Sequence, residues 1–219
     1  MSEFFDALRT TDWSTRLSQL QLPAMSIDLL QSIALGIGLA ACAGLRAWLP
    51  LFAVGVSVRL GVLPLGESFR FLGSNVALSV FAIATLIEVI ADKIPVVDHA
   101  LDALSTLLKP VAGVVLAASV LWTVDDPIVA IALGVMVGAP AAFAPHAAKA
   151  GLRGVLSPLT AGLAAPVLSV LEDIIAFGLV ALAILAPFVV AAGVLLFTLV
   201  TGKFLRKKMN PKPTPPVTA

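Results

Sequence analysis

The sequence predicts an all-α fold, a polytopic membrane helical bundle with six or seven helical segments, some of them broken or re-entrant. Hydrophobic residues make up 59% of the chain and charged residues only 12%, whereas a soluble domain is roughly 45–50% apolar. The mean hydropathy is +1.05, and several apolar segments approach the ~20 residues that a helix needs to cross a bilayer. Their residues do not alternate in polarity, as the strands of a membrane β-barrel would.

Residues 1–25 form an N-terminal segment that is either an interfacial amphipathic helix or a loosely ordered polar terminus. Phe5, Leu8 and Trp13 recur at approximate helical spacing, with charged residues between them. A secretory signal would begin with basic residues followed by an uninterrupted apolar core, and neither is present. The transmembrane helical domain is therefore predicted to cover residues 26–202.

The segment 29–60 is apolar but contains Arg46 and Pro50 near its centre. Two arrangements fit this pattern: a hairpin of two short helices that turns at Arg46, or one long broken helix with Arg46 buried against a carboxylate. An arginine in hydrocarbon has to face water or a partner. We therefore expect Arg46 to pair with an acid from another helix, with Glu88 as the first choice.

The remaining chain contains further apolar segments separated by polar or proline-containing connectors. The predicted helical segments are residues 76–91, 101–124 with an interruption at Pro110, 128–144, 155–176, and 179–201 with a kink at Pro187. Polar connectors are expected at 61–73 and 125–127, a basic connector at 146–153, and a turn at Phe177 and Gly178.

Small residues recur at four-residue spacing in two of the apolar segments, a pattern typical of close helix packing. They are Gly36, Ala40, Gly44, Gly134, Gly138 and Ala142. Cys42, the single cysteine, lies in the same setting and is expected to be a packing residue. With one cysteine, an intrachain disulfide is excluded.

Ionisable residues are concentrated in the stretch 88–102, between two apolar segments. They are Glu88, Asp92, Lys93, Asp98, His99 and Asp102. Residues four apart in a helix share a face, so Glu88 and Asp92 form one such pair if their segment is helical. Pro95 separates them from Asp98 and Asp102, which form a second pair.

Three interpretations of this stretch remain open. It is a solvated interfacial loop in which Asp98 caps a helix that starts at His99, an ion or proton site, or a structural partner of Arg46 or Arg153. An acid on a membrane-spanning segment favours a functional role. A second polar cluster is predicted from residues that follow in the chain: His146, Lys149, Arg153, Glu172 and Asp173.

Other kinds of chemistry have less support in the sequence. Carboxylates with one histidine suit a hard cation such as Mg²⁺, but their spacing matches no compact binding loop, so a metal stays unassigned. The serines stand in no nucleophile motif. We expect no cofactor and no nucleic-acid partner.

Residues 203–219 form a basic, proline-containing tail. Its cations are Lys203, Arg206, Lys207, Lys208 and Lys212, and it contains no acid. Because short cytoplasmic segments carry an excess of lysine and arginine, the tail is expected to be cytoplasmic. Counting back through the spans places the connector at 146–153 on the same side and Asp125 and Asp126 on the other.

Four motifs resemble a bacterial integral-membrane family known as domain of unknown function 4126. They are G-L-R-A-W-L-P-L-F, L-I-E-V-I-A-D-K-I-P-V-V-D-H, H-A-A-K-A-G-L-R and L-E-D. The resemblance covers roughly residues 30–190 and depends mainly on the run E-x-x-x-D-K-x-P-x-x-D-H. It implies a small multi-helix protein of the bacterial inner membrane. It singles out, without assigning roles, Arg46, Glu88, Asp92, Lys93, Asp98 and His99.

The preferred functional hypothesis is a small channel or transporter for an ion or small polar solute. Glu88 and Asp92 would bind the cation or proton, with Arg46 as the counter-charge, and Asp98 and His99 would line the cytoplasmic mouth. Lys93 and Asp102 belong to the same predicted ion- or solute-binding set. The alternative is a non-transporting scaffold or lipid-organising protein whose charges pair helices. An enzyme acting on lipid head groups is the third choice. Membrane lipids and the transported solute are the expected partners, and a homo-oligomer is also compatible.

Overall fold

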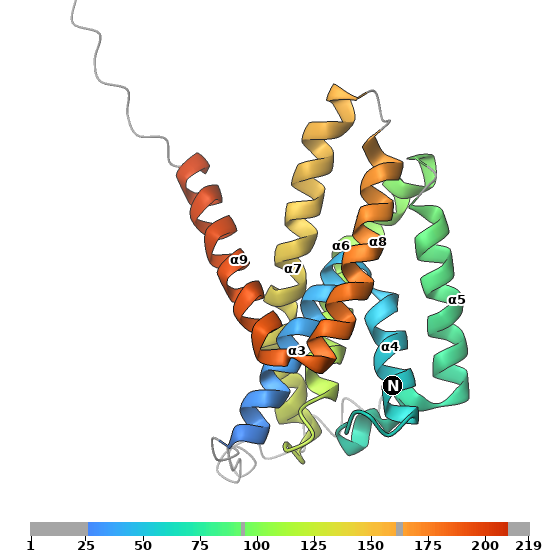
Figure 1. Ribbon diagram of the computed structural model, residues 1–219, viewed down its shortest axis with the longest axis vertical. Helices are drawn as coiled ribbons and strands as arrows, with labels where there is room; N and C mark the ends of the chain where they lie inside the picture. The colour runs from blue at the N-terminus through green and yellow to red at the C-terminus, as the bar shows by residue number, and fades with distance from the viewer. Residues whose placement is uncertain (1–25, 93–94, 161–163, 210–219) are drawn as a thin grey trace, which may run out of the picture.

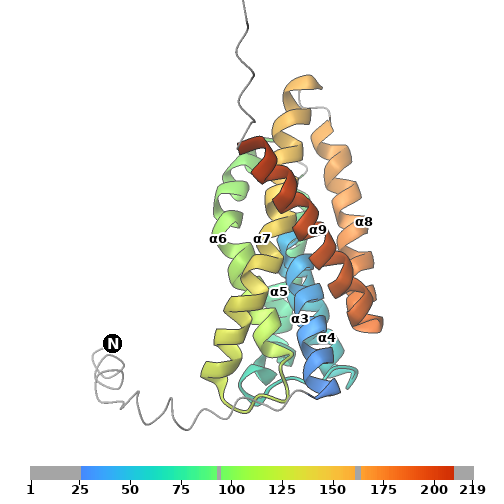
Figure 2. The ribbon, with the colours of Figure 1, turned by 90° about the vertical axis from the view of Figure 1, so that its left-hand side faces the viewer.

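The computed structural model of the protein describes residues 26–92, 95–160 and 164–209. All regular elements within these ranges are helices, as predicted. In chain order they are α3 (Ile27–Leu45), α4 (Trp48–Arg59), the 3-10 helix η1 (Glu67–Gly73), α5 (Asn75–Ala91), α6 (Pro95–Ser119), α7 (Pro127–Leu159), α8 (Ala164–Leu185) and α9 (Pro187–Met209). Together they form an elongated bundle (Figures 1 and 2).

Several of these helices are long and apolar enough to cross a membrane. They are α3, the part of α7 up to Leu152, and α8 from Val167. Elements η1 and α5 are bent by 61° relative to each other and give a fourth span if the pair is counted as one broken helix. The outer faces of the bundle expose many large apolar side chains, such as Ile83, Met136 and Leu196. Exposed apolar surface on this scale is typical of contact with lipid rather than with water. The protein is therefore a multi-pass helical membrane protein.

The chain reverses direction at Arg46, as in the first of the two arrangements predicted for residues 29–60. The hydroxyl of Ser26 accepts a hydrogen bond from the Leu29 N–H and caps the start of α3. At the other end of α3, Arg46 adopts an extended backbone conformation, which ends the helix. Helix α4 then runs back toward the end of the molecule where α3 begins (Figure 1).

Helices α3, α6 and α7 form the densest part of the bundle, and small residues allow their backbones to approach. A Cβ atom added to Gly44 would overlap the carbonyl oxygen of Ala142, and one added to Gly113 would lie 2.8 Å from the carbonyl oxygen of Gly138. Cys42 is fully buried in the same region. The predicted role of the small residues in close helix packing is confirmed.

The predicted interruption at Pro110 and the predicted helix end at residue 144 are both wrong. Helix α6 passes through Pro110 without interruption, and α7 passes through Pro140 and Pro145 to end at Leu159. The predicted basic connector is consequently part of α7. A proline removes one backbone hydrogen bond from a helix, but neighbouring helices and local adjustments compensate for this loss within a membrane.

The start of α6 also differs from the prediction. The helix begins at Pro95, so Asp98 belongs to its first turn and does not cap a helix starting at His99. Proline is favoured at the first position of a helix, because its missing N–H would have no partner there and its φ is already helical.

The boundary between the last two helices lies nine residues beyond the predicted turn, at Ala186 and Pro187 instead of Phe177 and Gly178. Gly178 is tolerated in α8 because it faces open space and does not have to end the helix. Pro187, which was expected to kink a single helix, is instead the first residue of α9.

The connections alternate between the two ends of the bundle as predicted. One end carries the start of α3, η1 and the polar turn before α7, in which Asp126 Oδ1 accepts a hydrogen bond from the Ile128 N–H. The other end carries the α5–α6 and α7–α8 connections and the end of α9 (Figures 1 and 2). The N-terminal segment 1–25 and tail residues 210–219 lie outside the described residues.

Candidate functional site

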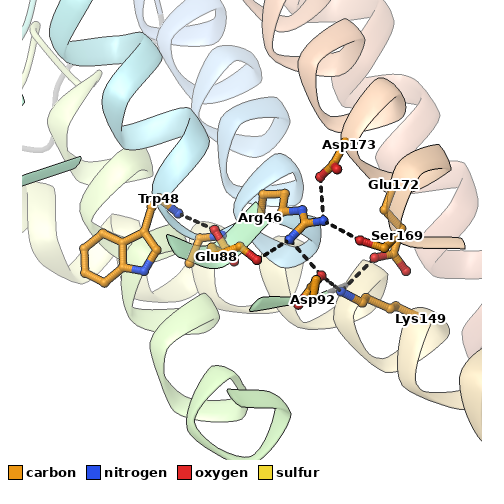
Figure 3. A network of polar contacts seen from close by, with 9 residues as sticks. Arg46, Trp48, Glu88, Asp92, Lys149, Ser169, Glu172 and Asp173 are labelled. Atoms are coloured by element: carbon orange, nitrogen blue, oxygen red, sulfur yellow. Dashed lines mark hydrogen bonds and ion pairs between the residues drawn. The ribbon is translucent and has the colours of Figure 1, made fainter. Parts of the chain in front are cut away.

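Arg46 lies at the centre of a buried polar network (Figure 3). Only 1% of its surface is exposed. Its Nη1 atom lies 2.7 Å from Asp92 Oδ2, and its Nη2 atom lies 2.5 Å from Asp173 Oδ1. The guanidinium also donates hydrogen bonds to the backbone carbonyl of Glu88 at 3.1 Å and to the hydroxyl of Ser169 at 3.2 Å. Arg46 therefore connects the end of α3 to α5 and α8.

The expectation that Arg46 pairs with an acid from outside its own helix is confirmed, but Glu88 as the first choice is wrong. The Glu88 carboxylate accepts hydrogen bonds from the backbone N–H groups of Ala47 at 3.0 Å and Trp48 at 3.3 Å. The sequence before α4 supplies no side chain that caps this helix. A carboxylate is stabilised at a helix N-terminus by the free N–H groups and the helix dipole, and Glu88 takes that position.

Asp92 joins Arg46 to a second cation, Lys149. The Lys149 Nζ atom lies 3.2 Å from the same oxygen of Asp92 that faces Arg46, and 2.8 Å from Glu172 Oε2. Two groups that the sequence analysis treated separately, one around Arg46 and one around Lys149, thus form a single network. Its ion pairs link residues from α3, α5, α7 and α8.

Two further polar side chains were missed by the sequence analysis. Ser169 is fully buried and lies on the same face of α8 as Glu172 and Asp173, three and four residues later. Lys109 is a cation within the apolar part of α6, and only 2% of its surface is exposed. A charged residue inside an apolar helical segment is the signal that would have identified Lys109.

The remaining predicted residues fall into two classes. His146 is buried on α7, and its Nε2 atom lies 3.4 Å from Thr106 Oγ1 on α6. Lys93 and the side chains of Asp98, His99, Asp102 and Arg153 lie outside what the structure describes. Among the described residues, no group of three histidine, cysteine, aspartate or glutamate side chains could hold a metal ion.

The helices that carry the network present apolar side chains on their outer faces at the same positions along the chain. Leu86, Ile87 and Ile90 are exposed on either side of Glu88 on α5, and Leu171 and Ile174 are exposed next to Glu172 and Asp173 on α8. The charges therefore lie inside an apolar shell. Each charge removed from water must be compensated by a partner of opposite charge. Arg46 and Lys149 accordingly each contact two carboxylates.

Fold and site together define a multi-pass helical membrane protein with a buried ion-pair network between its helices. The chain belongs to the family described as "Domain of unknown function (DUF4126)", whose model matches residues 33–207. That match includes the network from Arg46 to Asp173. Comparisons with curated proteins and with solved structures found no match.

Proposed function

We propose that the protein is a small channel or transporter of the bacterial inner membrane, and that the network around Arg46 is where it binds a proton or a monovalent cation. The supporting observation is a cluster of charged side chains that are withdrawn from solvent. Among the charged side chains that the structure describes, those that are not exposed comprise three cations and four carboxylates. They are Arg46, Lys109, Lys149, Glu88, Asp92, Glu172 and Asp173.

Carboxylates that are held away from water in a membrane-spanning bundle are candidates for binding a proton or a cation. The fourth carboxylate, Glu88, is partly compensated by the N-terminus of α4. The proton or cation would therefore bind at the carboxylates that α4 does not engage, which are Asp92, Glu172 and Asp173.

Glu172 and Asp173 are the preferred entry point for the ion. Their side chains are 13% and 16% exposed, compared with 7% for Asp92 and 1% for Arg46. Because one oxygen of Asp92 faces both Arg46 and Lys149, a charge bound at α8 would change the partners of both cations. Such an exchange would couple ion binding to a shift of α8 against α3 and α7.

The proposed orientation places the C-terminus in the cytoplasm. The end of the bundle with η1 exposes four acids and two arginines, namely Asp28, Glu67, Asp125, Asp126, Arg59 and Arg70. The opposite end receives α9, on which Lys203 is exposed, and the basic tail follows. The positive-inside rule favours this second end as cytoplasmic.

Transport by the purified protein is the direct test of this proposal. The protein would be reconstituted into liposomes and screened with dyes sensitive to pH, K⁺ and Mg²⁺, followed by a set of small polar solutes. We expect flux of at least one species above that of empty liposomes. If no flux is seen across the whole panel, the channel or transporter proposal is rejected.

A structural scaffold is the second candidate, because the ion pairs of Arg46 and Lys149 join helices that are distant in sequence. A scaffold needs these pairs only for assembly. It therefore predicts a loss of thermal stability when a pair is broken, together with no flux from the wild-type protein.

A further inference from the structure

The structure contains an apolar crevice of about 250 Å³ between α4, α5, η1 and α6. Every residue that lines it is apolar. Trp48 and Phe81 form part of its wall, with ring centroids 6.2 Å apart and ring planes inclined by 30°. Phe71 and Val111, which also line the crevice, are more than half exposed, so the crevice opens at the outer surface of the bundle.

The crevice exists because α5 is attached to α4 and η1 but lies at the edge of the bundle (Figure 1). A Cβ atom on Gly55 of α4 would lie 2.5 Å from the Leu72 carbonyl oxygen and 2.8 Å from the Leu78 side chain. This close contact holds the start of α5 near α4. Along α5 itself, Ala91 is the one buried residue, so no side chain of α5 is fully inserted between α4 and α6.

Water is a poor occupant for this space. A buried water needs two to four polar partners, and a cavity without polar groups stays dry or takes an apolar ligand. The crevice is bordered by the exposed apolar residues Phe71 and Val111, on helices of a membrane-spanning bundle. The crevice therefore opens on the apolar outer surface of the bundle, the kind of surface that contacts lipid.

We propose that the crevice is a binding site for one acyl chain of a membrane phospholipid. A flexible hydrocarbon chain matches the apolar lining, and its entry from the bilayer exposes no polar group. The aromatic rings of Trp48 and Phe81 provide a rigid surface for it. The bound acyl chain would also contact the start of α4, because Trp48 lines the crevice. The backbone N–H of the same residue donates a hydrogen bond to the Glu88 carboxylate.

Fluorescence of Trp48 tests this proposal. The chain has three tryptophans, and the variant Trp13→Phe/Trp122→Phe retains Trp48 alone. The purified variant in detergent would be titrated with a phospholipid that carries bromine atoms on its acyl chains, since bromine quenches tryptophan on contact. We expect quenching that saturates at a low ratio of lipid to protein.

Filling the crevice provides the comparison. In the same background, Ala112→Phe and, separately, Val111→Phe place a ring in the crevice and should remove the saturating component of the quenching. Val189→Phe adds the same ring to an exposed position on α9 and should leave it unchanged. If Ala112→Phe does not fold, Val111→Phe, at an exposed position, decides the comparison.

Two results would overturn the proposal. Quenching that rises without saturation, equally in all the variants, would mean that Trp48 only meets bulk lipid. Saturable quenching that persists in both filled variants would place the lipid elsewhere. Neither outcome depends on whether the protein transports a solute.

Discussion

A single oxygen atom of Asp92 lies 2.7 Å from Nη1 of Arg46 and 3.2 Å from Nζ of Lys149. The carboxylate stands at the end of α5, the guanidinium at the end of α3 and the ammonium within α7. This shared contact joins helices that are far apart in sequence. Because the three groups are at least 93% buried, removing the charge of any one of them leaves its partners without compensation in a site that excludes water.

Removing the central cation should strongly destabilise the protein. Arg46→Ala leaves Asp92 and Asp173 without their shared partner, and breaking a buried ion pair in this way costs about 3–5 kcal/mol. Thermal unfolding in detergent, followed by loss of monodisperse protein, measures the effect. Arg59→Ala, at an exposed position near the η1 end, is the control and should change little.

A second mutation, added to Arg46→Ala, identifies the acid that pairs with Arg46. Asp173→Asn in the Arg46→Ala background should recover part of the lost stability, since it removes a stranded charge. Glu88→Gln in the same background should not, because the Glu88 carboxylate binds α4. Recovery by Glu88→Gln alone would contradict the observed pairing.

Glu88 is predicted to act as the N-terminal cap of α4. Glu88→Ala removes both acceptor oxygens and should destabilise the protein by about 1 kcal/mol, as loss of a helix cap does. Glu88→Gln keeps one oxygen that can accept from the Ala47 N–H, so its effect should be smaller. An equal and large loss for both variants would show that the charge of Glu88, rather than its hydrogen bonds, is what matters.

Much of this architecture could be predicted from the sequence. Apolar segment lengths predicted the helical membrane fold, and the spacing of small residues indicated the close packing of α3 and α7. Charged residues are rare in this apolar sequence, which identified Arg46, Asp92, Lys149, Glu172 and Asp173 as candidate site residues. What local pattern could not supply was their convergence, which depends on how the helices are rotated and paired.

The wrong predictions concern features that depend on packing between helices. The sequence predicts an interruption at Pro110 and a helix end at residue 144, just before Pro145, because proline ends helices in water, whereas packed membrane helices tolerate it. Glu88 was assigned to Arg46 by charge alone, although the uncapped start of α4 competes for it. Ser169 carries no charge and gave no signal in an apolar helix.

Close packing of the central helices gives a prediction with a matched control. Gly138→Ala places a methyl group against the carbonyl oxygen of Gly113 and against Ala117, and such overpacking costs about 1–3 kcal/mol. Gly193→Ala, in α9, faces open space and should be neutral or slightly stabilising. Unfolding temperatures of the two variants check this, and equal behaviour would contradict the packing of α6 on α7.

The orientation can be tested with C-terminal fusions. A fluorescent protein that folds only in the cytoplasm should give a signal when fused to the C-terminus, because the basic tail follows α9. A phosphatase that is active only in the periplasm should be inactive at the same position. The reverse result would invert the proposed topology.

The central claim is that the interior carboxylates of α8 bind the transported or coupling ion. The decisive measurement is flux into proteoliposomes that contain either the wild-type protein or the Glu172→Gln/Asp173→Asn variant, assayed for the species that the wild type moves. Glu67→Gln, an exposed acid near Arg70 on η1, is the matched control. Flux that is lost in the α8 variant, while that variant still folds into a monodisperse protein and the control keeps wild-type flux, is the predicted result. Wild-type flux in a folded Glu172→Gln/Asp173→Asn protein would contradict the claim.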